Sequence, residues 1–213
     1  MDEVRKWHQE KLLLKVVDAL KRRDFDAHYF AGIDEVNEFL LKEIPSSASI
    51  GIGGSVTIRE LGIIEKFEQR NNIVIHHWRA GLTEQTDREI RKRELLADYY
   101  LTSANAITKS GDIINIDGIG NRISGMIYGP ENVFIVAGYN KIVGSIHDGI
   151  KRSKEIAAVM NAKRVSAHTP CVGTGVCIDC NVKGRICRVI SIIQYRPWQT
   201  KISVLLVNER LGF

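Results

Sequence analysis

Strand-like and helical segments alternate along most of this chain, and this alternation is the strongest constraint on its fold. Alternating elements of this kind favour a largely parallel sheet that is covered by helices on both faces. We therefore predict an α/β fold of three layers, α/β/α. Helices are expected at 2–22, 57–69, 83–96 and 141–160, and strands at 25–30, 73–75, 99–107 and 133–137.

The organisation along the 213 residues predicts a single domain over 1–213. No internal repeat or low-complexity linker divides the sequence. Residues 1–45 are interpreted as a helical preface, and Asp34 is a candidate cap for its second helix. Residues 113–116 should return as a hairpin after the turn at 110–112. The apolar segments 189–194 and 202–207 are expected to pair with each other and to extend the main sheet.

A glycine-rich stretch at 49–62 is predicted to turn a buried strand into a helix. Glycine lacks a Cβ and allows a sharp turn, and Thr57 followed by Glu60 has capping-box spacing. Unpaired amides at the start of a helix can bind an anion. The alternative is a tight turn that binds nothing. The candidate ligand-binding residues in this stretch are Gly51, Gly53, Gly54, Ser55 and Thr57.

A second group of polar residues follows the next predicted strands. Ligands of open parallel sheets collect at the carboxyl ends of the strands, so Asn105, Gly118, Asn121 and Arg122 are expected to share a cleft with Gly54.

Three residues are candidates for chemistry in that cleft: Glu60 and Asp117 as acid–base groups and Lys141 as a charge stabiliser. The simpler alternatives are that Glu60 caps a helix, Asp117 organises a turn and Lys141 pairs with an acid.

Composition narrows the class of partner. The formal net charge is +5 and the isoelectric point is about 9.0, but basic and acidic residues are interspersed. The chain has no basic stripe interleaved with aromatic residues, so no nucleic-acid face is expected. No apolar run approaches the length that spans a membrane, and the charged first residues do not form a signal peptide. The net charge alone would suit nucleic acid, an anionic cofactor or an acidic protein partner, but we prefer to interpret it as a mildly basic surface. We expect a cytoplasmic protein.

The four cysteines all fall in one loop, 165–188, with the spacing Cys171-x5-Cys177-x2-Cys180-x6-Cys187. In a reducing compartment this clustering favours metal over disulfides. Sulfur ligation indicates zinc or an iron–sulfur cluster. Zinc sites usually show two Cys-x2-Cys pairs, and the spacing also departs from the ferredoxin run. The remaining alternative is a set of reduced structural thiols.

Taken together, several stretches resemble the LUD-domain family of lactate-utilisation proteins, in particular the stand-alone branch that ends in a cysteine loop. The resemblance implies a fold similar to the glucosamine-phosphate isomerase, ribose-phosphate isomerase and CoA-transferase superfamily. It also implies a role beside iron–sulfur or flavin oxidoreductases. The stretches that carry it are 51–62, 97–108, 115–122, 129–130, 136–142 and 169–187.

Three functions follow as hypotheses. The first is a redox accessory protein with a 4Fe–4S cluster at the cysteines and a small anion at the glycine loop. The second is a transferase- or isomerase-like enzyme acting on a phosphorylated or CoA-linked substrate. The third is a non-catalytic ligand-binding module with structural zinc.

Overall fold

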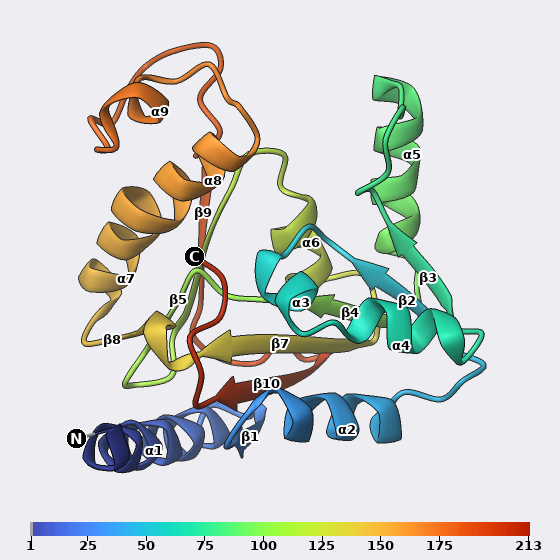
Figure 1. The fold of residues 1–213 in the computed structure, drawn as a ribbon, viewed down its shortest axis with the longest axis vertical. Helices are drawn as coiled ribbons and strands as arrows, with labels where there is room; N and C mark the ends of the chain where they lie inside the picture. The colour runs from blue at the N-terminus through green and yellow to red at the C-terminus, as the bar shows by residue number, and fades with distance from the viewer. Residues whose placement is uncertain (1) are drawn as a thin grey trace.

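The computed structural model describes residues 2–213, and its main sheet has six strands that are all parallel. This confirms the predicted parallel sheet (Figure 1). Across the sheet, the order is β1 (Asp26–Phe30), β10 (Lys201–Val207), β7 (Asn132–Gly138), β4 (Tyr99–Thr102), β2 (Ser49–Ile52) and β3 (Ile73–His76).

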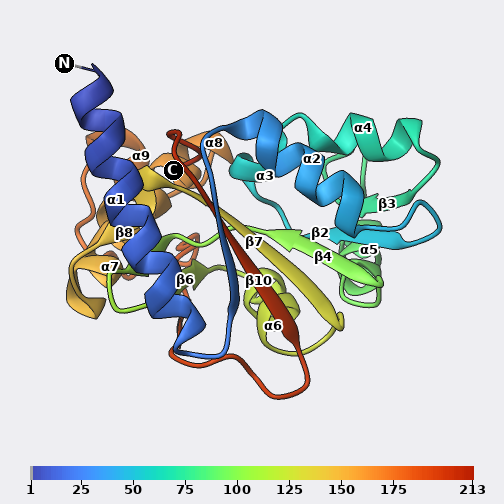
Figure 2. The ribbon, with the colours of Figure 1, turned by 90° about the horizontal axis from the view of Figure 1, so that it is seen from below.

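Two hydrophobic clusters, one on each face of this sheet, produce the three layers. Successive residues of β7 alternate between them: Val133 and Ile135 pack on one face, and Phe134 and Val136 on the other. This is the period of two that a strand requires. One face is covered by α2 (Ile33–Glu43), α3 (Val56–Glu60) and α4 (Ile63–Gln69). The other is covered by α1 (Asp2–Lys21), α6 (Asn121–Ile127) and a second sheet (Figure 2).

The second sheet was not predicted. Its order is β8 (Ile142–Val143), β5 (Ala106–Thr108), β6 (Ile113–Asp117) and β9 (Val189–Ile193). The β5–β6 hairpin agrees with the prediction, but the predicted strand 99–107 is divided between the two sheets. The pairing of the last two strands was wrong. β9 pairs antiparallel with β6, while β10 lies between β1 and β7. Both segments are apolar, and apolar content identifies a strand without identifying its partner.

The preface is not only helical, because β1 forms one edge of the main sheet between α1 and α2. The cap of α2 is Gly32, and Asp34 lies inside the first turn. The expected helix at 57–69 is divided into α3 and α4 at Gly62, whose φ of 62° is left-handed. Such a conformation favours glycine and interrupts a right-handed helix.

Some of the remaining helices lie beside the cysteine loop, and another lies beside β3, an edge strand of the main sheet. The helix expected at 141–160 begins only at Ile146, because Lys141 lies in the short turn η1 (Tyr139–Lys141) and β8 follows it. None of the helices in residues 2–213 combines the length and apolar content needed to cross a bilayer. The remaining bounds are α5 (Glu84–Glu94), η1 (Tyr139–Lys141), α7 (Ile146–Arg152), the π-helical turn η2 (Ser153–Ala158), α8 (Val159–Arg164) and α9 (Pro170–Thr174).

Candidate functional site

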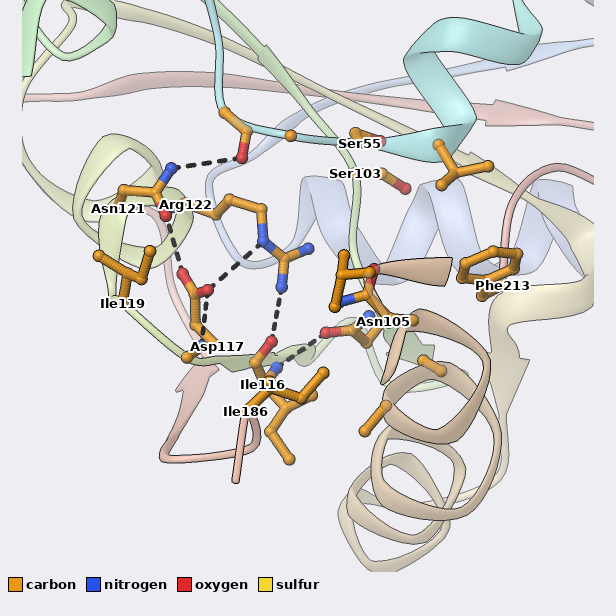
Figure 3. Close-up of a pocket in the computed structure, with 18 of the residues that line it drawn as sticks. Ser55, Ser103, Asn105, Ile116, Asp117, Ile119, Asn121, Arg122, Ile186 and Phe213 are labelled. Atoms are coloured by element: carbon orange, nitrogen blue, oxygen red, sulfur yellow. Dashed lines mark hydrogen bonds and ion pairs between the residues drawn. The ribbon is translucent and has the colours of Figure 1, made fainter. Parts of the chain in front are cut away.

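A cavity of about 310 Å³ lies beyond the carboxyl ends of β2, β4, β6 and β7. The segments that follow these strands bring together most of the predicted site residues (Figure 3). The structure therefore agrees with the expectation of a shared cleft. The predicted residues that line it are Gly53, Gly54, Ser55, Thr57, Asn105, Asp117, Gly118, Asn121, Arg122 and Lys141.

The glycine-rich stretch at 49–62, the glycine loop, forms one wall of this cavity. Two of its positions require glycine. Gly54 has φ +90°, and a Cβ there would lie 3.1 Å from the His77 ring. A Cβ on Gly53 would collide with the Tyr100 hydroxyl group. The Asn121 amide donates to the Gly53 carbonyl oxygen at 3.4 Å and thereby joins the loop to α6.

The start of α3 differs from the prediction. Ser55 is the cap, and its hydroxyl oxygen accepts from the Ile58 amide at 3.3 Å. Thr57 lies inside the helix and is buried. With only five residues, α3 provides little helix dipole for an anion. An anion in this cavity would therefore depend mainly on side-chain cations for its attraction.

We predict that Gly54→Val weakens the binding of inorganic phosphate by at least about tenfold, or about 1.4 kcal/mol. A branched side chain would strain the left-handed backbone and press on His77. Isothermal titration calorimetry measures the affinity. Gly81→Val is the matched control, since Gly81 also has positive φ but has open space around it. Equal phosphate affinity in the Gly54 variant and the parent would mean that the loop is only a turn.

Asp117 organises the turn before α6 rather than presenting a free carboxylate. Its Oδ1 accepts from the Gly118 amide at 2.9 Å, and its Oδ2 accepts from the Arg122 amide at 3.0 Å. Arg122 Nε lies 3.7 Å from Asp117 Oδ1, and Arg122 Nη2 donates to the Ile116 carbonyl oxygen at 2.6 Å. Figure 3 shows Asp117 and Ile116 holding the Arg122 guanidinium group. Asp117 therefore acts as a positioning residue for Arg122.

We predict that Asp117→Asn lowers the free energy of unfolding by about 1 kcal/mol, because an amide cannot accept at both positions as the carboxylate does. Urea unfolding measures this loss. Asp34→Asn is the control, since Asp34 occupies the first turn of α2 with no capping role. Equal losses in the two variants would contradict the positioning role of Asp117.

Lys141 is the most deeply buried cation of the cavity, with 3% of its surface exposed. Its Nζ donates to Thr57 Oγ1 and to Ser103 Oγ, both at 2.7 Å. Burial, followed by the charges of Arg152 and Arg122, lowers the pKa of Lys141 to about 7, while Glu60 acts in the opposite direction. This environment disfavours the charged form on which the predicted role of charge stabiliser depends.

Two predicted residues lie outside the cavity lining. Gly51 is in β2, where a Cβ would collide with the Glu94 main chain, so its role there is packing. Glu60 Oε2 accepts from the Gly212 amide at 2.6 Å and holds the segment that leads to Phe213. Neither position supports the role assigned from the sequence.

Several lining residues were not found from the sequence. Ser103 directly follows β4, a position that could have identified it. Arg164 at the end of α8 and Phe213 reach the cavity from segments that carry no motif. His77 Nδ1 lies 2.6 Å from the fully buried Glu94 Oε1, a long-range contact that no local pattern indicates.

The cysteine loop folds beside α8. The Pro170–Thr174 turn carries Cys171 and ends at Gly175 in the left-handed conformation. All four cysteines are half-buried and unpaired, and together they line a small cavity of about 20 Å³. Its other walls include Ala158, Val159, Ile178 and Ile186. Within residues 2–213, no three His, Cys, Asp or Glu side chains are grouped closely enough to hold a single metal ion.

Arg185 fixes the backbone of this loop. Its guanidinium group donates to the carbonyl oxygens of Cys187 and Cys180, both at 2.8 Å, and to Asp179 Oδ1 at 2.8 Å. Lys154 of η2 also donates to Asp179, at 3.0 Å. Two cysteine positions are therefore held through their main chains, independently of their thiol groups.

The cysteine cavity and the larger cavity share a wall. Ile186 and Cys187 line both of them. The Arg188 amide donates to the Asp117 carbonyl oxygen at 2.9 Å, and Gly118 packs so closely on the Ile186 carbonyl that a Cβ would lie 2.7 Å from it. The end of β6 thus connects the two sites directly.

The fold of this chain is similar to that of a solved structure. The crystal structure of a DUF162 family protein from Deinococcus radiodurans is similar, with a TM-score of 0.54 and 14% sequence identity. The alignment covers 93% of this chain and 98% of that one, and at this identity it shows the fold alone. No curated protein matches the chain. The family model of the LUD domain matches residues 13–207, nearly the whole chain, which therefore belongs to the LUD domain family.

Proposed function

We propose that this protein is a redox accessory protein of the lactate-utilisation type. It binds a small anion in the larger cavity and a 4Fe–4S cluster at Cys171, Cys177, Cys180 and Cys187. Its partner is an iron–sulfur or flavin oxidoreductase. The observation that carries the proposal is the shared wall, because Ile186 and Cys187 line both cavities.

The donor set of the cysteine cavity supports the cluster proposal. Four unpaired thiols surround it, and its other walls are largely apolar. Zinc held by four thiolates is the alternative, and it requires four sulfurs about 2.3 Å from one point. An iron–sulfur cluster would supply one-electron chemistry when bound. Lys154 and Arg185 are placed to offset the charge of four thiolates.

The larger cavity suits an anion because its lining carries more positive than negative side chains. Its lining includes Arg91, Arg122, Arg164 and Lys141, whereas Asp117 is its one acidic side chain among the described residues. Arg164 donates to Asn161 Oδ1 at 2.7 Å and has no carboxylate partner in the described chain. Its pKa is lowered, by burial first and then by Arg59 and Arg122. A bound anion would relieve this crowding of positive charge.

Anaerobic purification tests the cluster. We expect iron and acid-labile sulfide together with absorption in the visible range. Zinc without iron would instead favour a ligand-binding module with a structural metal. A folded protein that holds no metal after anaerobic purification and reconstitution would contradict the cluster proposal.

Calorimetry with inorganic phosphate, lactate and pyruvate tests the anion site separately. We expect at least one of the three to bind, and Arg122→Met and Arg164→Met to weaken that binding. Lys151→Met is the control, because Lys151 is exposed on α7 outside the cavity lining. If none of the three binds to the folded protein, the anion site is wrong whatever the metal content.

A further inference from the structure

The amine of Lys141 is buried and forms two hydrogen bonds to hydroxyl groups. It lies in η1 directly after β7, inside the wall of the larger cavity. Its two hydrogen-bond partners, Thr57 and Ser103, also line that cavity. None of the ion pairs within residues 2–213 includes Lys141.

The hydrogen bonds match a neutral amine. A protonated lysine has three N–H donors and no acceptor, whereas the neutral form has two N–H bonds and one lone pair. The hydroxyl oxygens of Thr57 and Ser103 provide acceptors for two N–H bonds, so the neutral form keeps its lone pair. Burial and the neighbouring arginines favour the same form. Removing a lysine from solvent beside other cations is a known way of activating it.

The surroundings also define what the amine could attack. Arg122 and Arg164 line the same cavity and can hold a carboxylate. Lysine amines add to carbonyl carbon atoms. A molecule that carries a carboxylate next to a carbonyl group, a 2-oxo acid, matches both features.

We propose that Lys141 forms an imine with a 2-oxo acid bound in the larger cavity. This inference rests on the proposed anion-binding function of that cavity. The Nζ lone pair adds to the carbonyl carbon; the nitrogen loses one proton and the carbonyl oxygen gains one, which gives a carbinolamine. Loss of water then forms the carbon–nitrogen double bond. No electrons are exchanged with another molecule in this sequence.

Reductive trapping tests the proposal on the 213-residue chain. Pyruvate is the probe, and borohydride donates hydride to the imine carbon and leaves a stable secondary amine. Peptide mass spectrometry should place on Lys141 a mass increase equal to pyruvic acid minus one oxygen atom. Lactate, which has no carbonyl group, is the control ligand and should give no adduct.

Two variants separate specific from general reactivity. Lys141→Met should lose the adduct, whereas Lys151→Met should keep it, since Lys151 is exposed outside the cavity. If Lys141→Met does not fold, peptide mapping of the parent protein still decides the outcome. Equal labelling of Lys141 and the exposed lysines would overturn the proposal.

Binding measurements distinguish the failure of this inference from the failure of the proposed function. Pyruvate that binds by calorimetry but leaves Lys141 unmodified would overturn the imine and leave the anion site intact. If neither phosphate, lactate nor pyruvate binds and no adduct forms, both proposals are wrong. An adduct on Lys141 whose yield falls when phosphate competes would support both.

Discussion

Replacing Cys180 by serine is expected to abolish iron binding in anaerobically purified protein. The hydroxyl of serine is a far poorer ligand for iron than a thiolate, and three cysteines leave one position without sulfur. The backbone should keep its place, because Arg185 donates to the Cys180 carbonyl oxygen at 2.8 Å whichever side chain follows. Iron and sulfide analysis and the visible spectrum measure the loss.

Hydrogen exchange tests whether loss of the cluster also destabilises the cysteine loop. Residues 168–188 contain little regular structure and little buried apolar surface, so loss of the cluster should accelerate exchange there first. Exchange in β2 and β7 should stay slow. Chelation of the parent protein should give the same pattern. Val176→Ser is the matched control, because Val176 lies in the same loop with 61% of its surface exposed and outside the cysteine cavity. Iron content equal to the parent in Cys180→Ser would contradict the role of this cysteine.

The layers of the fold could be predicted because each element carries its own pattern. The continuous apolar run of β7 marks a strand that is buried on both faces, as in a parallel sheet. The same pattern does not determine which strand a given strand pairs with. β9 and β10 are adjacent in sequence and both apolar, yet they belong to different sheets. Long-range packing decides that pairing, and no local pattern records it.

Most of the cavity could be predicted for a similar reason. Glycines and polar residues that directly follow strands meet at one edge of a parallel sheet. The prediction failed where a side chain had two possible partners. Glu60 has capping-box spacing to Thr57, but its carboxylate reaches Gly212, 152 residues further along the chain. Thr57 likewise accepts a hydrogen bond from Lys141 Nζ instead of capping the helix.

The chemical state of Lys141 was beyond sequence reasoning for a physical reason. A lysine after a strand is normally solvated or paired with an acid. Here burial is the main cause of the lowered pKa, and the charges that add to it come from other segments, Arg152 on α7 and Arg122 on α6. Only the folded chain removes water from the amine and places these charges around it.

Between pH 7 and pH 9, the parent protein should gain about 2 kcal/mol of unfolding free energy relative to Lys141→Met. Folding lowers the pKa of Lys141 from 10.5 to about 7. Between these values the unfolded chain binds a proton that the folded chain does not bind, so stability rises with pH. Below this window both states bind the proton, and the full cost of burying the charge remains.

Urea unfolding of both proteins at pH 7, 8 and 9 measures this difference under reducing conditions. Subtracting the two curves removes the contribution of every other titrating group, provided that those groups are unchanged by the substitution. Lys151→Met is the control and should run parallel to the parent, because Lys151 is exposed. If Lys141→Met does not fold, Lys141→Gln keeps a donor for Thr57 or Ser103 and serves in its place. A difference that stays constant across the three pH values would mean that Lys141 remains charged in the folded protein.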